Sequence, residues 1–259
     1  MESESVIEFE RSAVDQENQA AAADERAWLE AVRLGNAMKG FAGILRIGIV
    51  VASLAVLIGI AWQGSPSNSA LFVTLAIGFL SLLLVEVFSV WGARVASAPH
   101  PDATGELEEL RIPARRSRAY ANVVLGLIAA NVVGILVLVV AGRLQFQLPD
   151  EVVMVLTGLL GAVQLAALAM RVFLWFAYMR TAKYAALCIN APQLAATIAG
   201  TWWLFVIFVI VGPITAGILW LYAFVRQSII YFALTRHAHR TLRGERQTLL
   251  GQAAEALPV

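Results

Sequence analysis

The chain has 259 residues, of which 59% are hydrophobic and only 14% charged, and its formal net charge is +1. Because soluble domains carry about 25% charged residues, this composition excludes an ordinary water-soluble fold and predicts an all-α, polytopic membrane protein. A transmembrane β-barrel would alternate polar and apolar residues, whereas the apolar stretches here are continuous, as in VVLGLIAANVVGILVLVV.

The N-terminal segment is acidic and lacks the basic and apolar regions of a signal peptide. Residues 1–18 are polar and predict disorder. Residues 19–40 predict an amphipathic helix, because apolar positions such as Trp28 and Val32 recur on one face. This helix either leads directly into the first membrane span or lies at the membrane interface, anchored by Trp28.

Apolar stretches of about 20 residues, the length that crosses a bilayer as a helix, then follow one another along the chain. They predict six transmembrane helices, at about 41–62, 70–92, 120–141, 152–176, 193–211 and 214–234, with the longest loop at 93–119. The predicted domains are an acidic tail with its helix (1–40), a membrane domain (41–235) and a basic C-terminal tail (236–259).

The last apolar tract allows two readings, which differ at Gly212-Pro213. If the chain turns there, it crosses the membrane six times; if one kinked helix runs through Pro213, it crosses five times. Loops rich in Lys and Arg stay in the cytoplasm, and six spans place all four basic regions, with both termini, on the cytoplasmic side of the inner membrane. The pair Trp202-Trp203 favours five spans, because six spans bury it at mid-membrane.

A few polar side chains fall in or near the predicted spans, where they are costly and tend to pair with one another. Glu86 is the only acidic residue well inside a span, and Arg46, Arg171 and Arg226 are the basic residues nearest to span interiors. We expect Glu86 to pair with Arg46, since consecutive spans usually pack side by side. The cluster is either a structural ion pair with snorkelling arginines or a proton- or ion-linked site.

Two amides lie near the middle of consecutive spans, Asn131 in the third and Gln164 in the fourth. Because these helices are antiparallel neighbours, the two amides could form an interhelical hydrogen bond, either as packing or as part of a substrate site. Small residues also form a stripe on the first span and another on the fourth, which would allow close helix approach. The stripes are Gly48, Ala52, Ala55 and Gly59, and Gly158, Ala162, Ala166 and Ala169.

Arg236, Arg240 and Arg243 recur at helical spacing directly after the last predicted span. Such a basic stripe fixes topology and contacts headgroups, and it could also recognise anionic lipid or a partner protein. Nucleic acid is not an expected partner, because the stripe is short and has no interleaved aromatic residues for stacking.

The chemistry of an enzyme is missing from the sequence. All three histidines lie outside the spans, and neither a metal-binding His motif nor a P-loop nor a nucleophile elbow is present. We therefore expect no cofactor and no metal. The leading hypothesis is a non-enzymatic membrane scaffold or accessory subunit, whose partners are the bilayer and either another membrane protein or a second copy. The alternative is a small transporter or channel with a path lined by Glu86, Asn131 and Gln164.

Overall fold

The computed structural model describes residues 2–62, 68–101, 108–143, 149–211 and 218–255. Side chains are described for 16–60, 62, 74–101, 111–140, 149–201 and 222–244, apart from 75, 138 and 150. The described chain is all-helical. Its helices are α1 (Glu2–Trp62), α2 (Asn68–Ala96), α3 (Glu108–Arg143), α4 (Asp150–Cys188), α5 (Pro192–Val211) and α6 (Ile218–Glu255).

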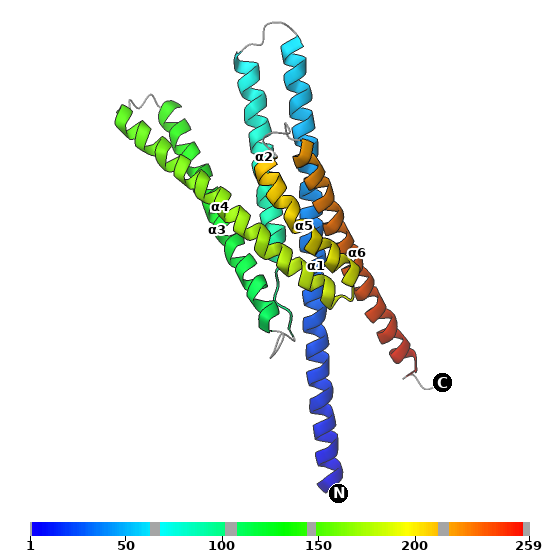
Figure 1. Cartoon of the computed structure of the whole chain (residues 1–259). Coiled ribbons are helices and arrows are strands. Elements are labelled where there is room, and N and C mark those ends of the chain that lie inside the picture. Colours follow the sequence, from blue (N-terminus) through cyan, green and yellow to red (C-terminus); the bar gives the residue numbers. More distant parts are fainter. Residues whose placement is uncertain (1, 63–67, 102–107, 144–148, 212–217, 256–259) are drawn as a thin grey trace.

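The six helices alternate in direction, and consecutive helices contact each other (Figure 1). α6 returns to pack against α1, so the principal contacts close a ring in chain order. Both ends of the chain lie at the same end of the bundle (Figure 1). α5 and α6 run in opposite directions, as the six-span reading requires, but the predicted turn at Gly212-Pro213 and the Trp202 and Trp203 side chains lie outside what is described.

Four described stretches are long and apolar enough to cross a membrane. They are Gln16–Ile60, Ala76–Ala96, Arg111–Val137 and Glu151–Cys188. They overlap the first four predicted spans. Each continues past its predicted span at one end or both, and the first three stop short of it at the other end. The fifth and sixth predicted spans include residues 202–221, whose side chains lie outside the described set.

The predicted N-terminal organisation is wrong in one respect. α1 is a single helix from Glu2 to Trp62, so the segment expected to be disordered is helical and the helix at 19–40 continues into the first span. An interfacial helix would need a break before the span, and the sequence offers none, because no proline or glycine pair interrupts residues 19–47.

The loop predicted at 93–119 is also shorter than expected. α2 continues to Ala96 and α3 begins at Glu108, so helix covers both ends of that stretch. Pro113 lies inside α3. It lies in the second turn, beyond the first four N–H groups that lack an intrahelical acceptor, so it removes one backbone hydrogen bond near the start of the helix.

α4 continues past the predicted end of the fourth span at 176 and ends at Cys188. Asn190 adopts a left-handed conformation, with φ of 55°, which asparagine tolerates better than most residues. The Ala191 N–H donates back to the Ala186 carbonyl at 2.8 Å, and α5 then begins at Pro192. Proline is favoured in the first helical position, because its φ suits the helix and its missing N–H has no partner there anyway.

Burial divides the bundle into two regions. We define the base as residues 28–46, 85–98, 113–131, 167–201 and 222–242, and the tips as residues 47–62, 76–84, 132–140 and 151–166. Every residue that the structure describes as buried lies in the base. In the tips, large apolar side chains such as Ile58 (60% exposed), Leu136 (60%) and Met154 (71%) point outward, and α3–α4 diverges from α1–α2 (Figure 1).

Close backbone approach holds the base together. A Cβ on Gly35 would overlap the Ala96 amide nitrogen and come within 2.5 Å of the Gly92 carbonyl oxygen, so α1 and α2 touch there directly. A Cβ on Gly43 would collide with the Ser228 hydroxyl of α6. The small-residue stripes predicted on the first and fourth spans do not serve this purpose within the chain, because Gly48, Gly59 and Gly158 have no neighbour within 4 Å.

Candidate functional site

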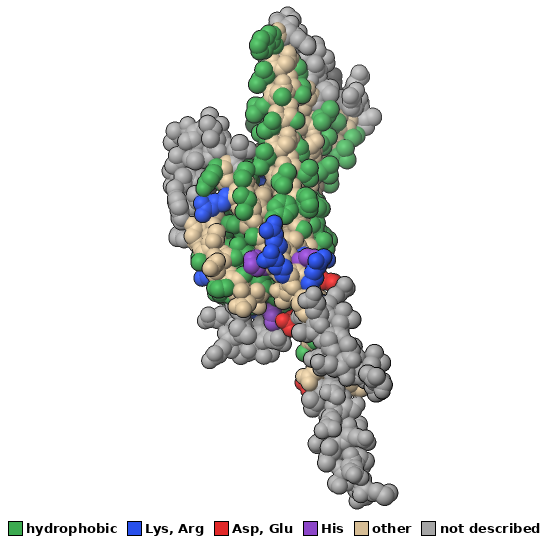
Figure 2. Space-filling model, turned by 90° about the vertical axis from the view of Figure 1, so that its right-hand side faces the viewer, with side chains coloured by type: hydrophobic (Ala, Val, Ile, Leu, Met, Phe, Trp, Pro, Cys, Tyr) green, Lys and Arg blue, Asp and Glu red, His purple; other side chains and the backbone are tan. Residues whose placement is uncertain are grey.

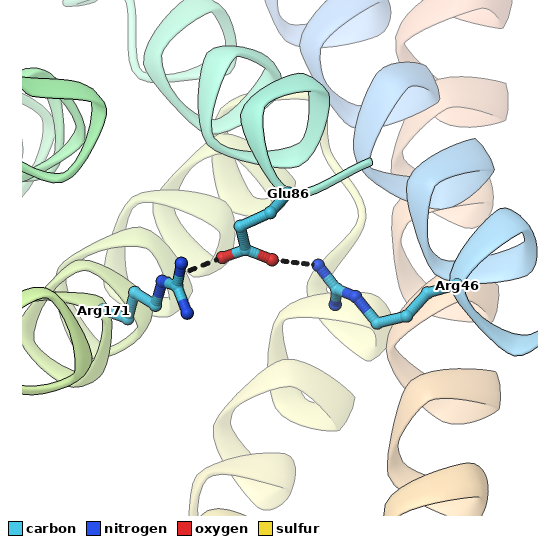
Figure 3. Close-up of polar contacts among 3 residues, drawn as sticks. All are labelled: Arg46, Glu86 and Arg171. Carbon is cyan, nitrogen blue, oxygen red and sulfur yellow. Dashed lines mark hydrogen bonds and ion pairs between the residues drawn. The ribbon is translucent and has the colours of Figure 1, made fainter. Parts of the chain in front are cut away.

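A charged cluster connects α1, α2 and α4 at the boundary between the base and the tips. Both oxygens of the Glu86 carboxylate on α2 are engaged by arginines: Oε2 accepts a hydrogen bond from Arg46 on α1, and Oε1 lies 3.2 Å from the Arg171 Nε on α4 (Figure 3). The predicted Glu86–Arg46 pair is therefore confirmed, and Arg171 makes it a three-residue cluster. These side chains are 20% (Arg46), 21% (Glu86) and 36% (Arg171) exposed.

Lys39 adds a third cation, which the sequence-based list of site residues missed. Its ammonium nitrogen lies 4.2 Å from the centre of the Tyr178 ring and 5.0 Å from that of Tyr231. It interacts electrostatically with Glu86 and Arg46. A sequence signal existed: Lys39 and Arg46 are seven residues apart, so they share one face of α1.

A buried hydrogen-bond chain lies beside Lys39. The Tyr178 hydroxyl on α4 donates to the Asn36 Oδ1 on α1 at 2.6 Å, and the Asn36 Nδ2 donates to the Val32 carbonyl at 2.8 Å. Both side chains are almost completely buried. A buried polar group is tolerated only when it is hydrogen-bonded, so this pair fixes how α4 lies against α1.

Long polar side chains thus attach α4 to the first two helices. α4 makes few close backbone contacts with α1 or α2; it is joined to them by the Arg171–Glu86 ion pair, the Tyr178–Asn36 hydrogen bond and the Lys39–Tyr178 contact. Farther down, the Ser97 hydroxyl of α2 donates to the Ser117 hydroxyl of α3 at 2.7 Å. These polar side chains therefore cross-link neighbouring helices of the base.

Three of the predicted site residues stay apart from this cluster. Arg226 donates to the Tyr222 hydroxyl at 3.1 Å on its own helix and makes no ion pair. Asn131 is buried, but Gln164 is exposed, and neither amide makes a hydrogen bond in the described part of the chain. The expected contact between the two amides is therefore wrong, because the inner face of α4 runs through Val163 and Ala167 and leaves Gln164 outside.

Basic side chains also gather on the surface of the base, on α1 and α6. We call Arg33, Arg236, Arg240 and Arg243 the basic band. The three arginines of α6 are exposed, and Arg33 lies 3.5 Å from the His239 Nδ1. In Figure 2, Lys, Arg and His side chains gather on this face where the apolar surface of the upper bundle ends. The predicted stripe is therefore present as a surface feature.

Metal-binding and nucleophilic groupings are not found in the described part of the chain. No three His, Cys, Asp or Glu side chains there lie together as metal ligands. Cys188 is a free, exposed thiol at the end of α4. A small cavity of about 30 Å³, bordered by Trp28, His100 and Cys188, is large enough for one water molecule only.

No protein family, curated protein or solved structure matches this chain. What the protein does must therefore be argued from its own residues.

Proposed function

We propose that the chain is a six-span protein of the inner membrane, with both termini in the cytoplasm, and that it acts as a non-enzymatic scaffold or accessory subunit. α5 and α6 supply the fifth and sixth spans. α5 has 20 residues, which as a helix extend for about 30 Å, the thickness of the hydrocarbon core. The basic band lies at the end that carries the termini, as expected for a cytoplasmic face.

The topology can be tested on one position near the C-terminus. In a chain with Cys188→Ser and a single cysteine inserted after Gly251, an impermeant maleimide should leave intact cells unlabelled and should label the protein after lysis. Labelling of intact cells would place the C-terminus outside and would contradict six spans.

The observation that carries the scaffold role is the N-terminal arm, which we define as Glu2–Asp24 of α1. The arm continues α1 well past the other helices (Figure 1), and at 1.5 Å per residue it is about 35 Å long. Its described side chains, Gln16 to Asp24, are all exposed. Most helical stability in proteins comes from tertiary packing, so a partner that packs against the exposed arm would stabilise it.

The composition of the arm suits another helix as the partner. Ala20 to Ala23 form an uninterrupted alanine run, which has high helix propensity and offers a smooth surface for close packing. Charged and amide side chains flank the run, including Glu17 and Asp24. Because successive residues of a helix lie about 100° apart, the four alanines encircle the arm as a short apolar band, against which a second helix could pack closely.

Site-specific photocrosslinking in native membranes tests the scaffold role. A photoreactive residue placed successively at positions 16–24 should give one adduct of constant mass, strongest at positions that share a helix face. The same residue at Leu136, a tip position that is 60% exposed, should give no such adduct. If no arm position yields an adduct of defined mass, or if Leu136 yields the same one, the scaffold role is contradicted.

The transporter alternative has less support in the geometry. Gln164 faces outward and Glu86 is bound by two arginines, so the three polar residues proposed to line a path do not form one.

A further inference from the structure

The charged cluster contains fewer negatively charged groups than positively charged ones. Arg46 and Arg171 face a single carboxylate, Glu86. No other acidic residue can reach it easily, because the sequence has none between Ala31 and Pro101 except Glu86, and none between Val152 and Gly244. An unpaired charge withdrawn from water is costly. The Arg46 guanidinium also lies over the Phe224 ring, but the two guanidinium groups share one carboxylate.

In the described part of the chain, most N–H donors of Arg46 and Arg171 have no hydrogen-bond partner. A guanidinium group has five N–H donors, and the described contacts of Arg46 are one hydrogen bond to Glu86 and a stacking contact with the Phe224 ring, 4.9 Å away. Arg171 contacts Glu86 through its Nε alone. Both side chains reach the surface, with exposed fractions of 20% and 36%. An anion with several oxygens could therefore bind both arginines without displacing Glu86.

The depth of the cluster indicates where such an anion would come from. Arg46 is five residues past the predicted start of the first span at Phe41, or about 8 Å along the helix axis. A long arginine side chain can span this distance towards the headgroups. The nearest abundant anion at that level is the phosphodiester of a lipid in the cytoplasmic leaflet, and arginine is well suited to bind phosphate with two N–H groups.

We propose that Arg46 and Arg171 bind the phosphodiester of an anionic lipid from the cytoplasmic leaflet, at a specific site between α1, α2 and α4. Glu86 aligns the two guanidinium groups and at the same time weakens binding through its own negative charge. The proposal requires that the chain lies in a membrane and does not depend on the scaffold role.

Native mass spectrometry of the whole chain, released from nanodiscs of phosphatidylcholine with a tenth phosphatidylglycerol, tests the site. The wild-type chain should retain one phosphatidylglycerol more strongly than phosphatidylcholine. Arg46→Gln and Arg171→Gln should each weaken this preference about tenfold, the loss expected for one charge-assisted hydrogen bond. The matched control is Arg226→Gln, since Arg226 is an arginine near the same depth that contacts only Tyr222; it should leave the preference unchanged.

Glu86→Gln separates a binding site from a purely structural cluster. Glutamine keeps an oxygen that can accept from an arginine but removes the competing charge, so phosphatidylglycerol retention should rise by severalfold. If the cluster were only structural, the same variant would lower retention or leave it unchanged. Equal losses in all three arginine variants would also overturn the proposal, because they would indicate nonspecific attraction.

A second arm of the experiment identifies the source of the phosphate. Inorganic phosphate at millimolar concentration should not compete with phosphatidylglycerol, because a lipid also gains contacts between its chains and the apolar helix surfaces. Competition by inorganic phosphate would instead show a site for a soluble anion, and it would overturn the assignment to lipid.

Discussion

The base and the tips are built from the same helices, yet they pack in opposite ways. In the base, helices approach until glycine backbones touch, and side chains such as Val32, Val124 and Leu234 are almost completely buried. In the tips, no described residue is buried. The difference is the one expected in a membrane, where apolar residues alone do not make helices associate. Lipid tails are as apolar as leucine, so a leucine side chain gains little free energy by leaving lipid for a neighbouring helix.

What distinguishes the base is that its small and polar residues face neighbouring helices. Gly35, Gly43 and Gly92 allow close contact between helices, and Asn36, Glu86 and Tyr178 cross-link helices that otherwise touch little. Van der Waals contact at small residues and interhelical hydrogen bonds are the forces that associate helices in lipid. The tips also contain small residues, but Gly48, Gly59 and Gly158 meet no neighbouring helix, and α3 and α4 diverge there from α1 and α2 (Figure 1).

The largest contrast between the two regions should come from one substitution made in each. Gly35→Ala places a methyl group on the Ala96 amide nitrogen and near the Gly92 carbonyl, and it should lower the free energy of unfolding by about 3 kcal/mol, as overpacking against backbone does. Gly48→Ala has no neighbour within 4 Å and should be neutral or stabilising by up to about 1 kcal/mol, because alanine favours helix. Unfolding by SDS titration measures both. Equal effects would contradict the division into base and tips.

A smaller effect is expected from the charged cluster. Glu86→Gln should lower the free energy of unfolding in phosphatidylcholine by about 2 kcal/mol, less than the loss for a fully buried ion pair, because its groups are partly exposed. Arg226→Gln, which breaks no ion pair, should change it by less than about 0.5 kcal/mol. The same titration measures both variants. An unchanged stability of Glu86→Gln would show that the ion pairs do not hold α4 to α2.

The smallest contrast concerns two tyrosine hydroxyls. Tyr178→Phe removes a buried hydrogen bond to Asn36 and leaves that amide without its partner, so it should cost about 1–2 kcal/mol. Tyr222→Phe removes an exposed contact with Arg226 and should cost less than about 0.5 kcal/mol. Thermal denaturation of the two variants side by side measures the difference. A neutral Tyr178→Phe would mean that the hydrogen bond does not fix α4 against α1.

Several features of the structure could be predicted from local sequence. The all-helical class, the four helices long and apolar enough to cross a membrane, and the start of α5 at Pro192 follow from apolar length and from proline and asparagine at helix ends. The Glu86–Arg46 pair was also predictable, because one acid in a span needs a cation on the neighbouring helix. The errors arose where loop-like composition was helical, at residues 1–18 and 108–119.

Other features depend on how whole helices rotate against one another, which no single helix encodes. Small-residue stripes occur on several spans, but only the packing selects Gly35 and Gly43 for contact and leaves Gly48 and Gly158 facing outward. Likewise Asn131 and Gln164 lie on neighbouring helices, yet the rotation of α4 exposes Gln164 and turns Arg171 towards Glu86. Local composition therefore indicates which segments are apolar and most of those that are helical, whereas which helix faces meet depends on the packing of all six helices at once.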